Sequence, residues 1–187
     1  MTAHALVPVK RLGGAKSRLA AALTPGERVE LVHEMLEAVL GAVEEAGIGP
    51  VTLVSSEPLA LNGVPRFDDR GLPWNDALAA AMREVVTEDV AVVVAGDLPR
   101  LHAAEVRELL ASTPQRGLAI ARAKDGGTNA VAMRPPGVLE THFGERASAR
   151  VHEEAALAVG LTAVVLDVDG LAFDVDTAED LAAWRER

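Results

Sequence analysis

The strongest indication of the fold is a run of six apolar residues at 90–95, made of four valines and two alanines. Valine favours the β-strand, and a strand that is apolar at every position must be covered on both faces. Strands of this kind lie in the centre of parallel sheets. The run ends at Gly96-Asp97-Leu98-Pro99, which is typical of a turn, so a carboxylate follows directly on a central strand.

Strand and helix patterns alternate along the rest of the chain. Thr24, Pro25 and Glu27 predict a helix start with a capping box, and apolar residues follow at helical spacing up to a stop at Gly47. We expect strands at 4–9, 51–55, 64–67, 90–95, 118–121, 129–133, 162–166 and 171–175, and helices at 25–46, 75–86, 101–110, 148–159 and after Thr177. This alternation predicts an α/β protein, a three-layer α/β/α sandwich with a mostly parallel sheet that binds ligands at the carboxyl ends of its strands.

We expect one domain over residues 1–187. The length suits a single core, and the sequence contains no internal repeat, low-complexity tract or linker. The longest irregular stretches, 56–74 and 134–147, are interpreted as substrate loops.

Composition excludes several classes of protein. Without cysteine there is no disulfide framework, thiolate metal site or cysteine nucleophile, and the five histidines lack the spacing of a zinc site. No run approaches the roughly 20 apolar residues of a membrane span, so we expect a cytoplasmic protein without a membrane partner. A formal net charge of -10 opposes nucleic-acid binding. The oligomeric state stays open, with a homodimer as one form.

The charge is unevenly distributed. The first 26 residues hold four basic side chains and no acidic one, so the other 161 residues carry a net charge of -14. The basic segment fits neither a Walker A loop, because Ala15 precedes Lys16, nor a G-x-G-x-x-G loop. A phosphate grip remains, and its expected members are the Gly13 and Gly14 amides with Lys10, Lys16 and Arg18. The alternative is a solvated basic turn.

Acidic residues offer a metal site. Asp97, at the end of a central strand, can hold Mg²⁺ that bridges phosphates, or else cap a helix. Asp174 and Asp176 form a second acidic pair, but alternation along the expected strand would put their carboxylates on opposite faces, so that at most one reaches the metal. From the residues alone, capping of the last helix by Asp176 or Thr177 is the favoured role.

Three further segments suggest binding sites. Residues 125–129 have the composition of a turn, and most such turns have no other role. Ser148 precedes a helix, where its hydroxyl and the first amides either bind a carboxylate or phosphate or simply cap the helix. Asn75 either reads the edge of a nucleobase or caps its helix.

Taken in order, these segments resemble the guanylyltransferases of coenzyme F420 biosynthesis, the 2-phospho-L-lactate or phosphoenolpyruvate guanylyltransferase family. The resemblance covers nearly the whole chain. It rests on Val7-Pro8-Val9-Lys10 with residues 15–19, Trp74-Asn75-Asp76-Ala77-Leu78, Gly96-Asp97-Leu98-Pro99, residues 125–130, Phe143-Gly144 with Ser148-Ala149-Arg150, and residues 174–181.

The resemblance implies a nucleotidyltransferase fold of the GT-A type and transfer of GMP from GTP to the phosphate of a three-carbon acid, with release of pyrophosphate. Carried over by position, the residues that would hold GTP phosphates are Lys10, Lys16 and Arg18, with Asn75 near the nucleoside. The resemblance assigns Mg²⁺ to Asp97 with Asp174 or Asp176, and the acid to Thr128, Gly144 and Ser148.

The chain also departs from the family pattern. Many members have a proline after the Phe-Gly pair, and an Arg-His pair where this chain has Arg150-Val151-His152. The acid, phosphoenolpyruvate or 2-phospho-L-lactate, stays open, and the preference for guanine comes only from the resemblance. Alternatives are a molybdenum-cofactor guanylyltransferase, suggested by Leu12-Gly13-Gly14, another nucleotidyltransferase of the same fold, or a nucleotide-binding scaffold without activity.

Overall fold

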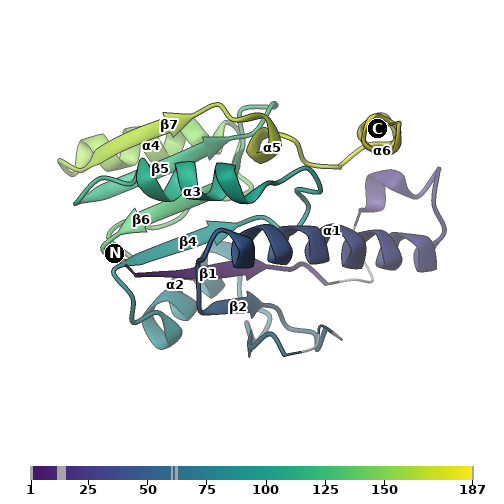
Figure 1. Cartoon of the computed structure of the whole chain (residues 1–187), viewed down its shortest axis with the longest axis horizontal. Coiled ribbons are helices and arrows are strands. Elements are labelled where there is room, and N and C mark those ends of the chain that lie inside the picture. The colour runs from purple at the N-terminus through teal and green to yellow at the C-terminus, as the bar shows by residue number, and fades with distance from the viewer. Residues whose placement is uncertain (1, 12–15, 60, 62, 187) are drawn as a thin grey trace.

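The computed structural model describes residues 2–11, 16–59, 61 and 63–186, and Figure 1 shows helices on both sides of one sheet. Its strands are β1 (Ala3–Pro8), β2 (Val51–Val54), β3 (Arg66–Phe67), β4 (Val90–Val94), β5 (Gly117–Arg122), β6 (Thr128–Arg134) and β7 (Thr162–Leu166). Its helices are α1 (Pro25–Glu45), α2 (Trp74–Val85), α3 (Ala103–Ala111), α4 (Ser148–Ala158), α5 (Asp169–Ala172) and α6 (Ala178–Arg185), with a 3-10 turn at Ser17–Leu19. Among the described residues, no helix is long and apolar enough to cross a membrane.

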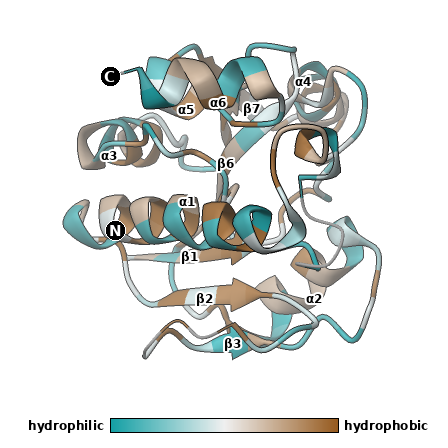
Figure 2. Ribbon diagram, turned by 90° about the vertical axis from the view of Figure 1, so that its right-hand side faces the viewer, coloured by the Kyte–Doolittle hydropathy of each residue, from teal (hydrophilic) through white to brown (hydrophobic). Residues whose placement is uncertain are grey.

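The central strand is β4, as the apolar run predicts. All five of its residues are fully buried. Val90, Val92 and Val94 face the core formed with α1, α3, α5 and α6, whereas Ala91 and Val93 face the core formed with α2 and α4. In Figure 2, β1 and β2 are likewise brown, or hydrophobic. The three-layer sandwich is therefore confirmed.

The strand order is β3-β2-β1-β4-β6-β5-β7, and every neighbouring pair is parallel except those that β6 makes with β4 and β5. Because β6 runs antiparallel, it begins at the edge of the sheet where β4 ends. The Ala95 amide donates a hydrogen bond of 2.8 Å to the Asn129 carbonyl there. Residues 128 and 129 consequently lie beside the turn that contains Asp97.

The strand expected at 171–175 is wrong. Residues 169–172 form the short helix α5, and residues 173–176 are irregular. The Gly170 amide donates to the Glu105 carboxylate at 2.7 Å, and the edge of β5 is already paired with β7. Phe173 and Val175 are buried, which produces the alternating pattern of a strand without a partner strand.

The N-terminus of α1 gives a test of local stability. Thr24 accepts a hydrogen bond from the Glu27 amide at 3.3 Å, and the Glu27 carboxylate accepts one from the Thr24 amide at 2.7 Å. Thr24→Ala removes the capping oxygen and is expected to lower the free energy of unfolding by about 1 kcal/mol in urea titrations. Thr24→Ser keeps the oxygen and is the control. Equal losses in both variants would contradict the capping role.

Candidate active site

The candidate site lies where β1 and β4 end and β6 begins. Asp97 follows β4, and its side chain is 31% exposed. It does not cap α3, whose N-cap is His102, so the capping alternative for Asp97 is wrong. Thr177 caps α6 through its hydroxyl, with Asp180 as its capping-box partner, which leaves the Asp176 carboxylate free of that role. Both acids are therefore available to a ligand or a cation.

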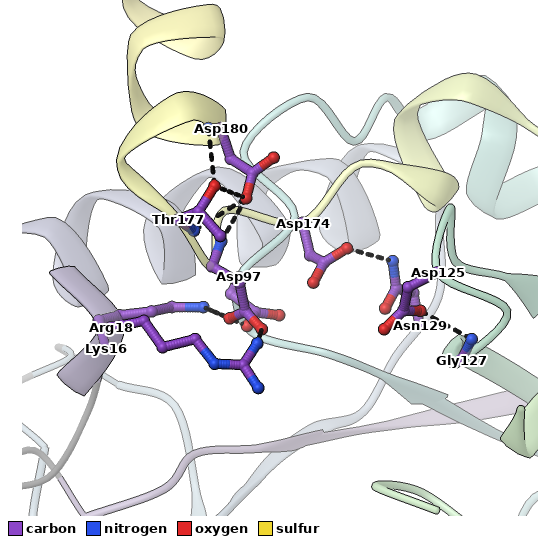
Figure 3. Close-up of polar contacts among 10 residues, drawn as sticks. Lys16, Arg18, Asp97, Asp125, Gly127, Asn129, Asp174, Thr177 and Asp180 are labelled. Atoms are coloured by element: carbon purple, nitrogen blue, oxygen red, sulfur yellow. Dashed lines mark hydrogen bonds and ion pairs between the residues drawn. The ribbon is translucent and has the colours of Figure 1, made fainter. Parts of the chain in front are cut away.

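Lys16 joins these two acids, and Figure 3 shows its side chain pointing toward Asp97. Its Nζ lies 2.5 Å from Asp97 Oδ2 and 2.9 Å from Asp176 Oδ1, although the two carboxylates are far apart in the sequence. The Lys16 side chain is only 8% exposed. Arg18 Nη1 lies 3.3 Å from Asp176 Oδ2, but its side chain is 73% exposed. The basic segment and the acidic residues thus form one site.

The Lys16 ammonium stays charged in this position. Burial by itself lowers the pKa of Lys16, but the charges and hydrogen bonds of Asp97 and Asp176 outweigh burial and raise that pKa overall. A charged Lys16 is therefore present at neutral pH to face an anionic ligand.

Asp174 is the third carboxylate of the site. Its Oδ1 accepts a hydrogen bond of 3.4 Å from Asn129 Nδ2 (Figure 3). The same Asn129 Nδ2 donates to the Leu171 carbonyl at 2.9 Å. Burial raises the pKa of Asp174, and the negative charges of Asp97 and Asp176 raise it further. The expected separation of Asp174 and Asp176 on opposite faces depended on a strand that does not form, and Asp174 interacts electrostatically with both Asp97 and Asp176.

Asn129 is a site residue that the sequence analysis did not single out. It lies in the motif at 125–130, but that segment resembles an ordinary turn. Its signal is a polar residue directly before the apolar run 130–133 of β6, where Asn129 is 6% exposed. A buried amide at such a position needs partners, and here Leu171 and Asp174 supply them.

The acidic residues fit a divalent cation by their chemistry. Carboxylate oxygens are the ligands that Mg²⁺ prefers, and Asp174 is a part-buried carboxylate whose pKa is raised first by burial and then by the negative charges of Asp97 and Asp176. Within the part of the chain that the structure describes, no three His, Asp or Glu residues are already grouped as a metal site. Lys16 Nζ instead lies between two of the three carboxylates. Ligation by Asp97, Asp174 and Asp176 stays a prediction.

Two adjoining cavities open beside this cluster. The first is lined by Lys10, Lys16, Asp97 and Asp176, together with Pro8, Val9, Val32, Met35, Trp74 and Gly96. The second begins at the same end of β1 and shares Pro8, Val9, Lys10 and Trp74 with the first. Lys10 Nζ lies 4.3 Å from the centre of the Trp74 ring, at the junction. Gly13 and Gly14, expected in the phosphate grip, lie outside the described residues.

Asn75 has different partners from those expected. It lies in the first turn of α2, whose N-cap is Pro73, so capping by Asn75 is wrong. Its Oδ1 accepts hydrogen bonds from the Thr141 hydroxyl and the Phe143 amide, each of 2.9 Å, and its Nδ2 donates to the Phe143 carbonyl. These bonds attach the loop that precedes α4 to the start of α2. A contact of Asn75 with the nucleoside stays a prediction and would use the remaining amide hydrogen.

The residues expected to bind the acid form a second, smaller group. Ser148 Oγ donates to Thr128 Oγ1 at 3.0 Å, and both side chains are buried. Ser148 is the first residue of α4 and Ala147 is its N-cap, so capping by Ser148 is wrong. Gly144 is exposed in the loop and has a φ of 81°, which favours glycine. The structure brings Thr128 and Ser148 together and leaves Gly144 accessible nearby in sequence.

His152 holds this group in place. Its Nδ1 lies 2.8 Å from the Ser148 carbonyl, and its Nε2 lies 2.8 Å from the His142 amide. A neutral ring with its proton on Nδ1 satisfies both contacts, because Nδ1 then donates and Nε2 accepts. Burial lowers the pKa of His152 to about 4.

This depressed pKa predicts a loss of stability in mild acid. Between the ordinary pKa of about 6.5 and the folded pKa of about 4, the unfolded chain binds a proton that the folded chain does not, so stability falls as pH falls. We expect His152 to account for about 2 kcal/mol of the decrease in unfolding free energy between pH 7 and pH 5. In urea titrations, His152→Gln should lose about 2 kcal/mol less unfolding free energy between pH 7 and pH 5 than the wild type does. The control variant His33→Gln should show the same decrease as the wild type. Equal pH dependence in the wild type and His152→Gln would contradict the assignment.

Comparison with known proteins identifies the family of this chain. The family model described as "Guanylyl transferase CofC like" matches residues 3–184. A phosphoenolpyruvate guanylyltransferase of Sphaerobacter thermophilus is 42% identical over 190 residues, which cover 97% of this chain and 91% of the relative. A 2-phospho-L-lactate guanylyltransferase of Haloarcula marismortui is 37% identical over 169 residues, which cover 89% of this chain and 78% of the relative.

Two further comparisons concern the acceptor and the fold. A 3-phospho-D-glycerate guanylyltransferase of Phenylobacterium zucineum is 34% identical, with 95% of this chain and 83% of the relative covered. A nucleotidyl transferase from Methanothermobacter thermautotrophicus has a similar structure, with a TM-score of 0.72 over 99% of this chain and 96% of that one. Its sequence is 16% identical, so it supports the fold alone.

Proposed function

The chain belongs to the CofC-like guanylyl transferase family, and from this premise we propose that it transfers GMP from GTP to the phosphate of a three-carbon acid in coenzyme F420 biosynthesis. The observation that carries the proposal is the buried Lys16 ammonium between Asp97 and Asp176, beside a two-part cavity. At one edge of the sheet, the cation can bind phosphates and the carboxylates can bind a metal ion, as a metal-bound nucleotide requires.

The triphosphate is assigned to the first cavity. Lys10 and Lys16 line it, and Arg18 lies beside Asp176 at its rim. These side chains supply the positive charge that a triphosphate needs in a protein of net charge -10. The Gly13 and Gly14 amides complete the proposed grip, and Asn75 lies toward the nucleoside. The acid is assigned to Thr128, Gly144 and Ser148.

The metal is assigned to the three carboxylates. Asp97, Asp174 and Asp176 would hold Mg²⁺, which neutralises phosphate charge when it is bound. Lys16 would then keep its hydrogen bonds or turn toward a phosphate oxygen, because an ammonium has three donors and two are in use.

The proposed reaction needs no protein nucleophile. An oxygen of the acceptor's phosphate forms a bond to the α-phosphorus of GTP, the bond from that phosphorus to the bridging oxygen breaks, and pyrophosphate leaves. The acceptor oxygen is already anionic at neutral pH, so no side chain has to remove a proton. The residues instead align the two anions and stabilise negative charge, and alignment alone contributes roughly 7 to 11 kcal/mol. We assign both tasks to Lys16.

The test supplies GTP and Mg²⁺ with one acid at a time. Phosphoenolpyruvate, 2-phospho-L-lactate and 3-phospho-D-glycerate are each incubated with the pure protein, and pyrophosphate release and the mass of the guanylylated product are measured. We expect release with one of these acids. No release with any of them would overturn the proposed function.

A further inference from the structure

The second cavity is not needed to bind the phosphates, and its lining differs from that of the first cavity. Its volume is about 330 Å³. Much of its wall is apolar, formed by Pro8, Val9, Val54, Leu72, Trp74 and Ala77. Leu72 is 44% exposed, which is unusual for a large apolar side chain in this protein. A flat apolar ligand would cover this surface.

The cavity continues directly from the proposed triphosphate site. Lys10 and Trp74 line both cavities, and the ammonium lies over the ring. A ligand with its phosphates beside Lys16 would therefore place its other end in the second cavity. If the proposed function holds, that end is the nucleobase.

A carboxylate lines the second cavity and is held in place. Asp69 Oδ1 accepts a hydrogen bond of 2.7 Å from the Gly71 amide, and the Asp69 carbonyl accepts one from the Leu72 amide. Arg70 and Gly71 have φ values of 53° and 73°, which turn the chain tightly around this carboxylate. Among the described residues, Asp69 Oδ2 has no hydrogen-bond partner. It is free to accept from a ligand.

A cationic donor lies beside the same turn. Arg11 Nε donates to Ser56 Oγ at 3.3 Å, and both residues line the cavity. The Arg11 guanidinium also approaches the turn, because a Cβ added to Gly71 would lie 3.6 Å from Arg11 Nη2. The cavity thus combines an acceptor, Asp69, with a multiple donor, Arg11.

We propose that Asp69 selects guanine. Guanine presents two neighbouring donors, N1–H and the 2-amino group, next to the O6 acceptor. A carboxylate can accept from both donors, and the Arg11 guanidinium can donate to O6. Adenine presents an acceptor at N1 where guanine presents a donor, so the carboxylate would face a lone pair. This inference rests on the proposed function and adds to it the residue that chooses the base.

The decisive variant is Asp69→Asn. Its amide oxygen can still accept from the Gly71 amide, so the turn is preserved, but one of its two acceptor positions becomes a donor. We expect about 10- to 100-fold weaker GTP binding, measured by calorimetry with Mg²⁺ present. We also expect stronger binding of XTP, because xanthine has an acceptor in place of the 2-amino group. The gain for XTP would show that the variant is folded.

Asp68→Asn is the matched control. Asp68 lies in the same turn, accepts from the Arg70 amide at 2.9 Å, and pairs with Arg66 outside the cavity lining. This variant should keep the wild-type preference for GTP over ATP, ITP and XTP. Asp69→Asn with an unchanged GTP to XTP ratio would overturn the proposal, as would an equal change in both variants.

Binding and turnover separate the two proposals. If the wild type prefers GTP in calorimetry, loses that preference in Asp69→Asn, and transfers GMP to none of the acids, the role of Asp69 stands and the proposed function fails. If the wild type transfers GMP and Asp69→Asn keeps the same base preference, the function stands and the role of Asp69 fails.

Discussion

Lys16→Met is expected to lower kcat/KM for GMP transfer by about 100- to 1,000-fold. The ammonium is the buried cation of the site and lies within hydrogen-bonding distance of Asp97 and Asp176. Methionine keeps most of the volume but removes the charge that would face the phosphates, and it leaves two carboxylates without their common partner. Steady-state pyrophosphate release measures the effect.

Arg18→Met is the control for Lys16. Arg18 pairs with the same Asp176, but its side chain is 73% exposed, so water screens its charge. We expect a loss of at most about tenfold. Because Asp97 and Asp176 are 31% and 44% exposed and can be hydrated, Lys16→Met should remain folded. A Lys16→Met enzyme within threefold of the wild type would show that the cation contributes little to the reaction.

Asp97→Asn is expected to lower turnover by about 1,000-fold, or about 4 kcal/mol of transition-state stabilisation. The amide has nearly the shape of the carboxylate, and its oxygen can still accept from Lys16. What the variant loses is a negative charge that would hold Mg²⁺ opposite the phosphates. Removing that charge should also lower the pKa of Asp174, because Asp97 is one of the groups that raise it.

The measurements for Asp97→Asn are turnover, GTP binding and the far-ultraviolet circular dichroism spectrum. We expect an unchanged spectrum and GTP affinity within a few fold of the wild type. Asp167→Asn is the control and should retain turnover, because Asp167 is 65% exposed and, within the described part of the chain, pairs only with Arg122 at the surface. Full turnover in Asp97→Asn would remove Asp97 from the metal site. GTP binding without turnover in the wild type would favour the scaffold alternative.

Local sequence signals predicted most elements because the interactions that define them are local. The capping box predicted at Thr24 connects residues three apart and is present in the structure, and Thr177 caps the last helix as expected. The strand expected at 171–175 failed for the opposite reason. A strand needs a partner with open hydrogen-bonding groups, and the alternation of apolar and acidic residues contains no information on whether one is available.

The contacts of the predicted site residues could not be read from the sequence, for a related reason. Asn75 and Ser148 have the residue types of ligand-binding groups, but in the fold their polar atoms bind the loop at 141–143 and Thr128. Those partners come from other elements of the chain. A residue type states what a side chain can bind, whereas its neighbours decide what it does bind.

The sequence by itself determined the layered α/β architecture, the segregation of basic residues at 10–18, and the positions of the three acids. Apolar periodicity and capping depend on neighbours along the chain, so they can be read without coordinates. Only the tertiary structure decided that Lys16 lies between Asp97 and Asp176, that Asn129 supports Asp174, and that Asp69 and Arg11 line one cavity. These contacts join segments far apart in the sequence, and the order of the strands determines which of those segments meet.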